Sequence, residues 1–135
     1  MLFRIFGNKI KKLLLILLCL PILFNSCQED KNDPNSPFIG TWTGSWLGGN
    51  FAGGNWFCNI SSNGDINGDV SSIDFDMAMD LTGTVTNSGN FTATIGTDSM
   101  GIKFIGELSS NSGNGTWIGS FSEDGTTGTW SGTKQ

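Results

Sequence analysis

Hydrophobic and polar residues alternate along the chain from Phe38 to the C-terminus. Apolar residues and glycines hold every second position, and the positions between them are mostly Thr, Ser, Asn, Asp and Lys. A period of two with one apolar face predicts antiparallel strands that are solvated on one side. The pattern predicts eight strands, over residues 38–47, 52–60, 65–73, 75–86, 91–97, 100–109, 115–121 and 126–134.

Turn signals separate these strands at short intervals. They are SSNGD at 61–65, NSGN at 87–90, NSGN at 111–114 and SEDG at 122–125. Such Gly-containing clusters mark hairpins, so consecutive strands should pair in an up-and-down meander. An open sheet of eight strands would expose two edges and a large apolar face, whereas closure removes both edges. The sequence therefore predicts an all-β fold, an eight-stranded antiparallel meander closed into a barrel.

A pattern of Gly-Thr-Trp-x-Gly-Ser/Thr occurs at 40–45, 115–120 and 128–133, on the first strand and the last two. With Gly40-x-Trp42 opening the first strand, the domain resembles the calycin group, the lipocalins and avidins. The resemblance implies a meander barrel. It does not extend to biotin binding, because the avidin-type carboxyl-terminal signature and the lipocalin cysteine pair are both missing.

The amino-terminal segment has the composition of an export signal. Basic residues precede Leu13–Phe24, twelve residues without a charge, and a helical membrane span needs about 20 apolar residues. The following Phe24-Asn25-Ser26-Cys27 resembles the lipobox of bacterial lipoproteins. The resemblance implies cleavage before Cys27 and a diacylglycerol on its sulfur, so that membrane lipid is a partner of the mature protein. The alternative is an ordinary cleaved signal with Cys27 as an incidental thiol.

These segments divide the chain into three parts. Residues 1–26 are expected to be a lipoprotein signal peptide, residues 27–37 the lipidated Cys27 with a polar tether, and residues 38–135 the barrel domain. The acidic residues directly after Cys27 resemble signals that carry lipoproteins to the outer face of the outer membrane. We therefore expect a lipid-anchored outer-membrane protein exposed at the cell surface.

Charge and composition exclude several classes of function. All twelve acidic residues follow Cys27 and only three lysines do, so the mature chain has a formal charge of −9. Such a charge excludes nucleic acid as a partner. The chain has no histidine, the commonest general base and metal ligand, and Cys58 has no partner for an internal disulfide. We expect a protein that is not an enzyme and has no cofactor.

The five tryptophans are the candidate ligand-binding residues. They share the inward parity, and closure of the barrel would bring their strands together into one aromatic inner wall. Eight-stranded barrels either fill with side chains or hold one small ligand. The wall is therefore either a pocket for a sugar-like or apolar molecule or plain core packing. The residues are Trp42, Trp46, Trp56, Trp117 and Trp130.

A second candidate is the stretch NGDINGDVSSID, residues 63–74, whose oxygen-bearing side chains resemble an EF-hand calcium loop. Asn63 replaces the usual leading Asp, Asp74 replaces the bidentate Glu, and both flanks are predicted strands. The alternative is a hairpin turn followed by a strand.

Two functions follow from these observations. The preferred expectation is a membrane-anchored surface lipoprotein whose small barrel binds a small apolar or sugar-like ligand. The alternative is a structural or interaction module with a filled barrel and no small-molecule ligand.

Overall fold

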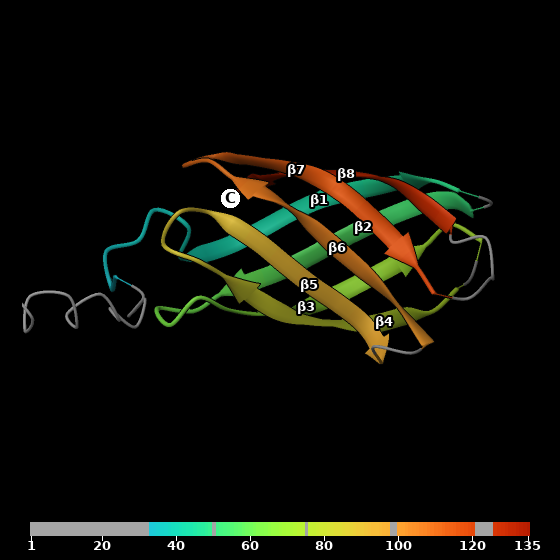
Figure 1. The fold of residues 1–135 in the computed structure, drawn as a ribbon, viewed down its shortest axis with the longest axis horizontal. Coiled ribbons are helices and arrows are strands. Elements are labelled where there is room, and N and C mark those ends of the chain that lie inside the picture. The colour runs from blue at the N-terminus through green and yellow to red at the C-terminus, as the bar shows by residue number, and fades with distance from the viewer. Residues whose placement is uncertain (1–32, 50, 75, 98–99, 121–125) are drawn as a thin grey trace, which may run out of the picture.

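The computed structural model describes residues 33–49, 51–74, 76–97, 100–120 and 126–135. Cys27 and the expected signal peptide lie outside these residues. The described chain contains eight strands (Figure 1): β1 (Gly40–Gly48), β2 (Phe51–Ile60), β3 (Asp65–Ser72), β4 (Ala78–Val85), β5 (Asn90–Thr97), β6 (Met100–Leu108), β7 (Ser112–Gly119) and β8 (Thr126–Lys134).

The strands form a closed antiparallel barrel. Each strand pairs with its neighbours in the sequence, and β1 also pairs with β8, from Trp42 opposite Lys134 to Gly48 opposite Gly128. In Figure 1 the red β8 accordingly lies beside the blue-green β1. The predicted meander and its closure are both confirmed, and the architecture is consistent with a calycin-like fold.

Two predicted strand starts are wrong by three residues. The signal NSGN at 111–114 was expected to be a turn, but β7 begins at Ser112, and the turn lies just before it, where the Ser109 N–H donates to Ser112 O at 2.7 Å. Pairing of Ser112 with Thr133 and of Gly113 with Leu108 extends β7 beyond what local turn propensity indicates. Strand β4 begins at Ala78 rather than residue 75, because its pairing with β3 ends at Ser71 opposite Ala78.

The hairpins at 61–65 and 86–90 share one geometry. In the first, the Gly64 N–H donates to Ser61 O and the Ser61 N–H donates to Asp65 O, both at 3.0 Å. Gly64 has a φ of 79° and Gly89, in the equivalent place, has a φ of 90°. This left-handed conformation favours glycine and completes a three-residue hairpin loop with a bulge. The turn chemistry in the sequence therefore fixes both hairpins.

One cluster of apolar side chains occupies the barrel interior. Its members follow the predicted inward parity on all eight strands, and Cys58, Val70, Ala93, Trp42 and Trp117 have no exposed surface. Met77 lies in the predicted strand 75–86, where the alternation places it on the inward face, but it is 65% exposed because it precedes β4 at the end of the barrel. Residues 75 and 121, which belonged to the predicted inward rows, lie outside the described chain.

The segment before β1 covers one end of the barrel. Phe38 is buried there, and its main-chain oxygen accepts the indole N–H of Trp42 at 2.8 Å. The Asp33 N–H donates to Asn87 Oδ1 at 3.0 Å, and Lys134 Nζ donates to Pro37 O at 2.7 Å. Residues 33–37, expected to be part of the tether, thus lie against the barrel.

Candidate functional site

All five tryptophans lie in the barrel interior, between 0 and 4% exposed. They come from β1, β2, β7 and β8, which are neighbours in the closed barrel. The rings of Trp46 and Trp117 meet edge to face with centroids 5.4 Å apart, and those of Trp56 and Trp130 do so at 5.7 Å. Such geometry is favourable for aromatic pairs. The structure therefore brings these residues together, as the parity indicated.

On the paired strands β1 and β2, Trp46 and Trp56 each lie opposite a glycine of the other strand. We call this reciprocal arrangement a tryptophan–glycine exchange. Trp46 stands opposite Gly54, while Trp56 stands opposite Gly44. A Cβ on Gly54 would lie 2.8 Å from Trp46 Nε1, and one on Gly44 would lie 2.6 Å from Trp56 Nε1. Each indole therefore occupies the space above a glycine that has no side chain.

The same exchange occurs across β7 and β8. Trp117 stands opposite Gly128, while Trp130 stands opposite Gly115. A Cβ on Gly115 would lie 2.6 Å from Trp130 Nε1, and one on Gly128 would lie 2.6 Å from Trp117 Cε2. The barrel thus contains two reciprocal tryptophan–glycine exchanges, one on each side of the β1–β8 closure.

Each of these four indoles crosses its glycine strand and donates to a main-chain carbonyl on the strand beyond. From β1 Trp46 reaches Ser71 O of β3, and from β2 Trp56 reaches Ser131 O of β8, both at 3.1 Å. From β7 and β8 the other two reach Leu47 O of β1 at 3.0 Å and Ile105 O of β6 at 3.1 Å. Each of these four side chains therefore links three strands, in addition to the main-chain hydrogen bonds between neighbouring strands.

The interior consequently has its polar groups satisfied. Among the described residues, no buried side-chain nitrogen or oxygen lacks a hydrogen-bond partner. A buried Trp N–H normally has a hydrogen-bond partner. Here the indoles can reach one because the glycines that they cross have no side chain. The geometry of the aromatic wall is that of core packing. Whether a ligand can also enter it stays a prediction.

The sequence carries a signal for these exchanges that the alternation alone does not reveal. Every tryptophan follows a glycine by two residues, in the triplets GTW, GSW, GNW, GTW and GTW. In four triplets the Trp and the Gly each take part in an exchange with the neighbouring strand. The triplet at 40–42 differs, because Trp42 donates to Phe38 at the barrel end.

Cys58 lies on β2 with its thiol inside the barrel and no exposed surface. Burial raises the pKa of this thiol to about 12. A thiol with a raised pKa is neutral at physiological pH and behaves as a small hydrophobe.

The acidic stretch at 63–74 forms a hairpin turn followed by β3. The Ser61 hydroxyl accepts the N–H groups of Asn63 and Asp65, which closes the turn. Asp65, Asn67 and Asp69 then point outward from an extended strand, where successive side chains on one face lie about 6.6 Å apart. Within the described chain, no group of three or more His, Cys, Asp or Glu residues could hold a metal ion.

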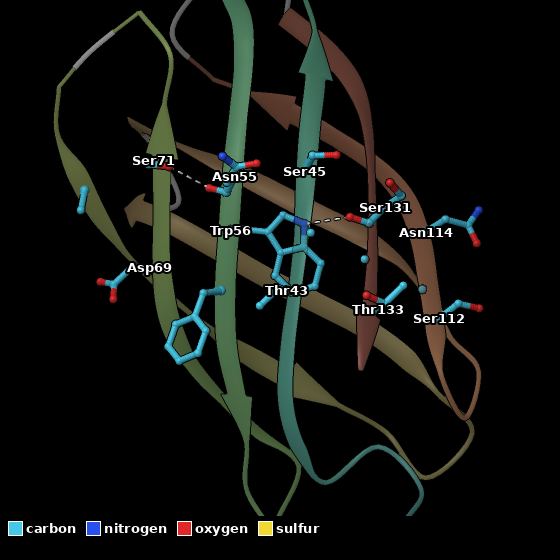
Figure 2. A pocket seen from close by; sticks show the side chains of 15 residues that line it. Thr43, Ser45, Asn55, Trp56, Asp69, Ser71, Ser112, Asn114, Ser131 and Thr133 are labelled. Atoms are coloured by element: carbon cyan, nitrogen blue, oxygen red, sulfur yellow. Dashed lines mark hydrogen bonds between the residues drawn. The ribbon is translucent and has the colours of Figure 1, made fainter. Parts of the chain in front are cut away.

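An open depression of about 830 Å³, which no pattern in the sequence indicated, lies on the outer wall of the barrel (Figure 2). Short polar side chains follow one another across five neighbouring strands at its centre. Strand pairing aligns each of them with the next, so they form one continuous row. This row, which we call the polar band, consists of Ser71, Asn55, Ser45, Ser131 and Asn114.

A second row flanks the polar band within the same depression. It contains Asp69, Phe57, Thr43, Thr133 and Ser112, again aligned by pairing across the strands. The phenyl ring of Phe57 is 47% exposed on this row. Trp56 also lines the depression, beside Gly44 and Gly132, where the β1 and β8 backbones carry no side chain. Aromatic and hydroxyl groups therefore meet at one outer surface.

A scan against protein-family models and a search of curated proteins each find no match to this chain. Within the residues that the structure describes, no helix has the length and apolar character of a membrane span. The small β-barrel is compatible with a binding module and with a structural module. Its inner wall consists of packed indoles, and its outer wall carries the polar band.

Proposed function

We propose that this protein is a lipid-anchored outer-membrane protein whose filled barrel serves as an interaction module and binds its partner through the polar band. The observation that carries the proposal is the set of four indole N–H groups bonded to main-chain carbonyls. With these bonds, no buried side-chain nitrogen or oxygen of the described residues lacks a partner, whereas the outer wall presents a row of polar groups. No catalytic residue or cofactor is part of the proposal.

The second candidate is a small apolar or sugar-like ligand held inside the barrel by Trp42, Trp46, Trp56, Trp117 and Trp130. The contiguous aromatic wall favours it. However, such a ligand has to displace at least one packed indole. Emptying the site of a buried Trp costs about 3–5 kcal/mol, and the displaced N–H loses a hydrogen bond as well. This penalty makes the outer wall the better binding surface.

The anchor completes the proposal. Lipidation of Cys27 would hold the mature chain on the membrane without a spanning segment, since two or more acyl chains anchor stably. Asp33 already contacts the barrel through Asn87. Six residue steps separate Cys27 from Asp33, and they extend to about 22 Å at most. An anchored barrel would therefore keep the end that Phe38 covers near the membrane.

The anchor is tested by expressing the wild type and Cys27→Ser in an outer-membrane-bearing host with labelled palmitate. We expect label and membrane retention in the wild type only. Protease added to intact cells should degrade the anchored protein. Retention of Cys27→Ser in the membrane fraction, without loss of label, would contradict the anchor.

The inner and outer walls are distinguished by titrating the soluble Cys27→Ser variant with palmitate. We expect neither the melting temperature nor the tryptophan fluorescence to change, because the interior is filled. A saturable rise in melting temperature that is lost in Trp117→Phe would instead establish the inner wall as the site.

A further inference from the structure

The polar band has the dimensions of an extended ligand rather than a compact one. Neighbouring strands lie about 4.8 Å apart, so its five side chains span roughly 19 Å across the barrel. They run nearly perpendicular to the strands, as Figure 2 shows for the labelled side chains of β3, β2, β1, β8 and β7. Because each strand contributes one side chain to the row, a chain lying along it would meet one side chain per strand.

The hydrogen-bonding groups of the band are available to a ligand. In the described part of the chain, the side chains of Ser45, Asn55, Ser131 and Asn114 make no hydrogen bond to another protein group. Ser71 Oγ makes one to Asn55 O, at a long 3.3 Å. Serine hydroxyls and asparagine amides each offer both donors and acceptors. The complementary ligand is one that presents donors and acceptors together, as a hydroxyl group does.

Charge restricts the class of ligand further. None of the five side chains of the band is ionisable, and among the described residues that line the depression only Asp69, on the flanking row, carries a formal charge. The mature chain has a formal charge of −9, which would repel a polyanion. A neutral ligand meets neither repulsion nor an unpaired charge.

The flanking aromatic group completes the chemistry. The exposed ring of Phe57 provides apolar surface beside the hydroxyl and amide groups, whereas the Trp56 indole lies buried beneath Gly44 and Gly132. Pyranose rings have apolar C–H faces and polar edges, so they match such a mixed surface.

A peptide segment fits this surface less well. In the described chain every strand has a paired neighbour on both sides, so no strand offers a whole free edge to a peptide backbone. Protein interfaces also need an apolar centre, and the centre of this depression is a row of serines and asparagines. The geometry points to a neutral glycan chain, lying across β3, β2, β1, β8 and β7 along the polar band, as the ligand of this protein. This inference rests on the proposed outer-wall binding and names its ligand class.

The experiment uses the full chain in micelles of a detergent without a sugar headgroup. Cellohexaose, maltohexaose, xylohexaose and mannohexaose are the neutral probes, and an oligogalacturonate of the same length is the charged control. Isothermal titration calorimetry should detect binding of at least one neutral probe and none of the oligogalacturonate. A panel in which no neutral probe binds, or in which the oligogalacturonate binds as well, overturns the glycan inference.

Substitutions locate the site. Asn55→Ala and Asn114→Ala each remove one or two hydrogen bonds, so each should weaken binding about 3- to 30-fold. Phe57→Ala should weaken it as well. The matched control is Thr84→Ala, an exposed position on β4 outside the depression, which should bind like the wild type. Near-UV circular dichroism establishes that each variant is folded, and unchanged affinity in folded Asn55→Ala and Asn114→Ala refutes the site.

The failures of the two proposals are distinguishable. A neutral probe that binds but whose affinity falls only in Trp117→Phe, with altered tryptophan fluorescence, would place the ligand inside and refute both. A barrel that binds neither the glycans nor palmitate would refute the glycan class alone and leave the filled scaffold standing.

Discussion

Replacing Gly115 by alanine tests whether the tryptophan–glycine exchanges hold the barrel together. In an ordinary strand this change removes conformational freedom from the unfolded chain, and it therefore stabilises the folded protein by about 0.5–1 kcal/mol. In this barrel the new methyl group would lie 2.6 Å from Trp130 Nε1 and 2.6 Å from Gly106 Cα, and against Ile105 O. The structure therefore predicts the opposite sign, a destabilisation.

The magnitude follows from what the methyl group displaces. Moving the indole breaks its 3.1 Å bond to Ile105 O, and a buried donor left without a partner costs about 1–3 kcal/mol. Overpacking a filled core costs about 1–3 kcal/mol more. After subtracting the backbone gain, we expect a net loss of about 2–4 kcal/mol, which lowers the melting temperature of a domain of this size by about 10–25 °C.

Urea unfolding followed by tryptophan fluorescence measures this change, with exposed Thr116→Ala on the same strand as the control. Thr116→Ala should stay within about 0.5 kcal/mol of the wild type. The Gly115→Ala/Trp130→Phe double variant should lose less than the sum of the single variants, because the smaller ring leaves room for the methyl group. A Gly115→Ala protein as stable as the wild type, or additive losses in the double variant, would refute the reasoning.

Three further predictions concern other parts of the molecule. The pKa of Cys58 is about 12 when folded against 9.0 for a free thiol, so the folded state keeps a proton that the unfolded state loses between those values. The free energy of unfolding should fall as pH rises above about 9, by at most about 1.4 kcal/mol per pH unit, and this slope should be reduced in Cys58→Ala. Phe38→Ala should cost about 3 kcal/mol in urea unfolding, since it uncovers the barrel end beside Gly89 and Trp42; a loss below about 1 kcal/mol would mean that the segment before β1 is not part of the fold. Calcium in millimolar excess should leave the melting temperature unchanged; a rise that is lost in Asp65→Ala would restore the calcium-loop hypothesis for residues 63–74.

The sequence determined the fold class because its signals are local. A strict period of two distinguished the inner face from the outer face on every strand. The glycines in SSNGD and TNSGN indicated the hairpin loops that contain Gly64 and Gly89. Closure also followed from the sequence, since only pairing of the first and last strands could remove two exposed edges. The errors fell where pairing decides the ends of strands: it extends β7 to Ser112, and it ends before Met77.

Only the tertiary structure decided what the two walls of the barrel are. Parity put the tryptophans inside, but register decided that Trp46, Trp56, Trp117 and Trp130 each face a glycine and bond to a carbonyl on the strand beyond. The polar band cannot be recognised in the sequence either. Its two end members, Ser71 and Asn114, are 43 positions apart, and they belong to one row only because five strands are aligned by pairing. A one-residue slip in any of those pairs would turn its side chains to the other face. Composition and alternation specify which residues face outward, whereas the register of the closed sheet specifies which of them stand side by side.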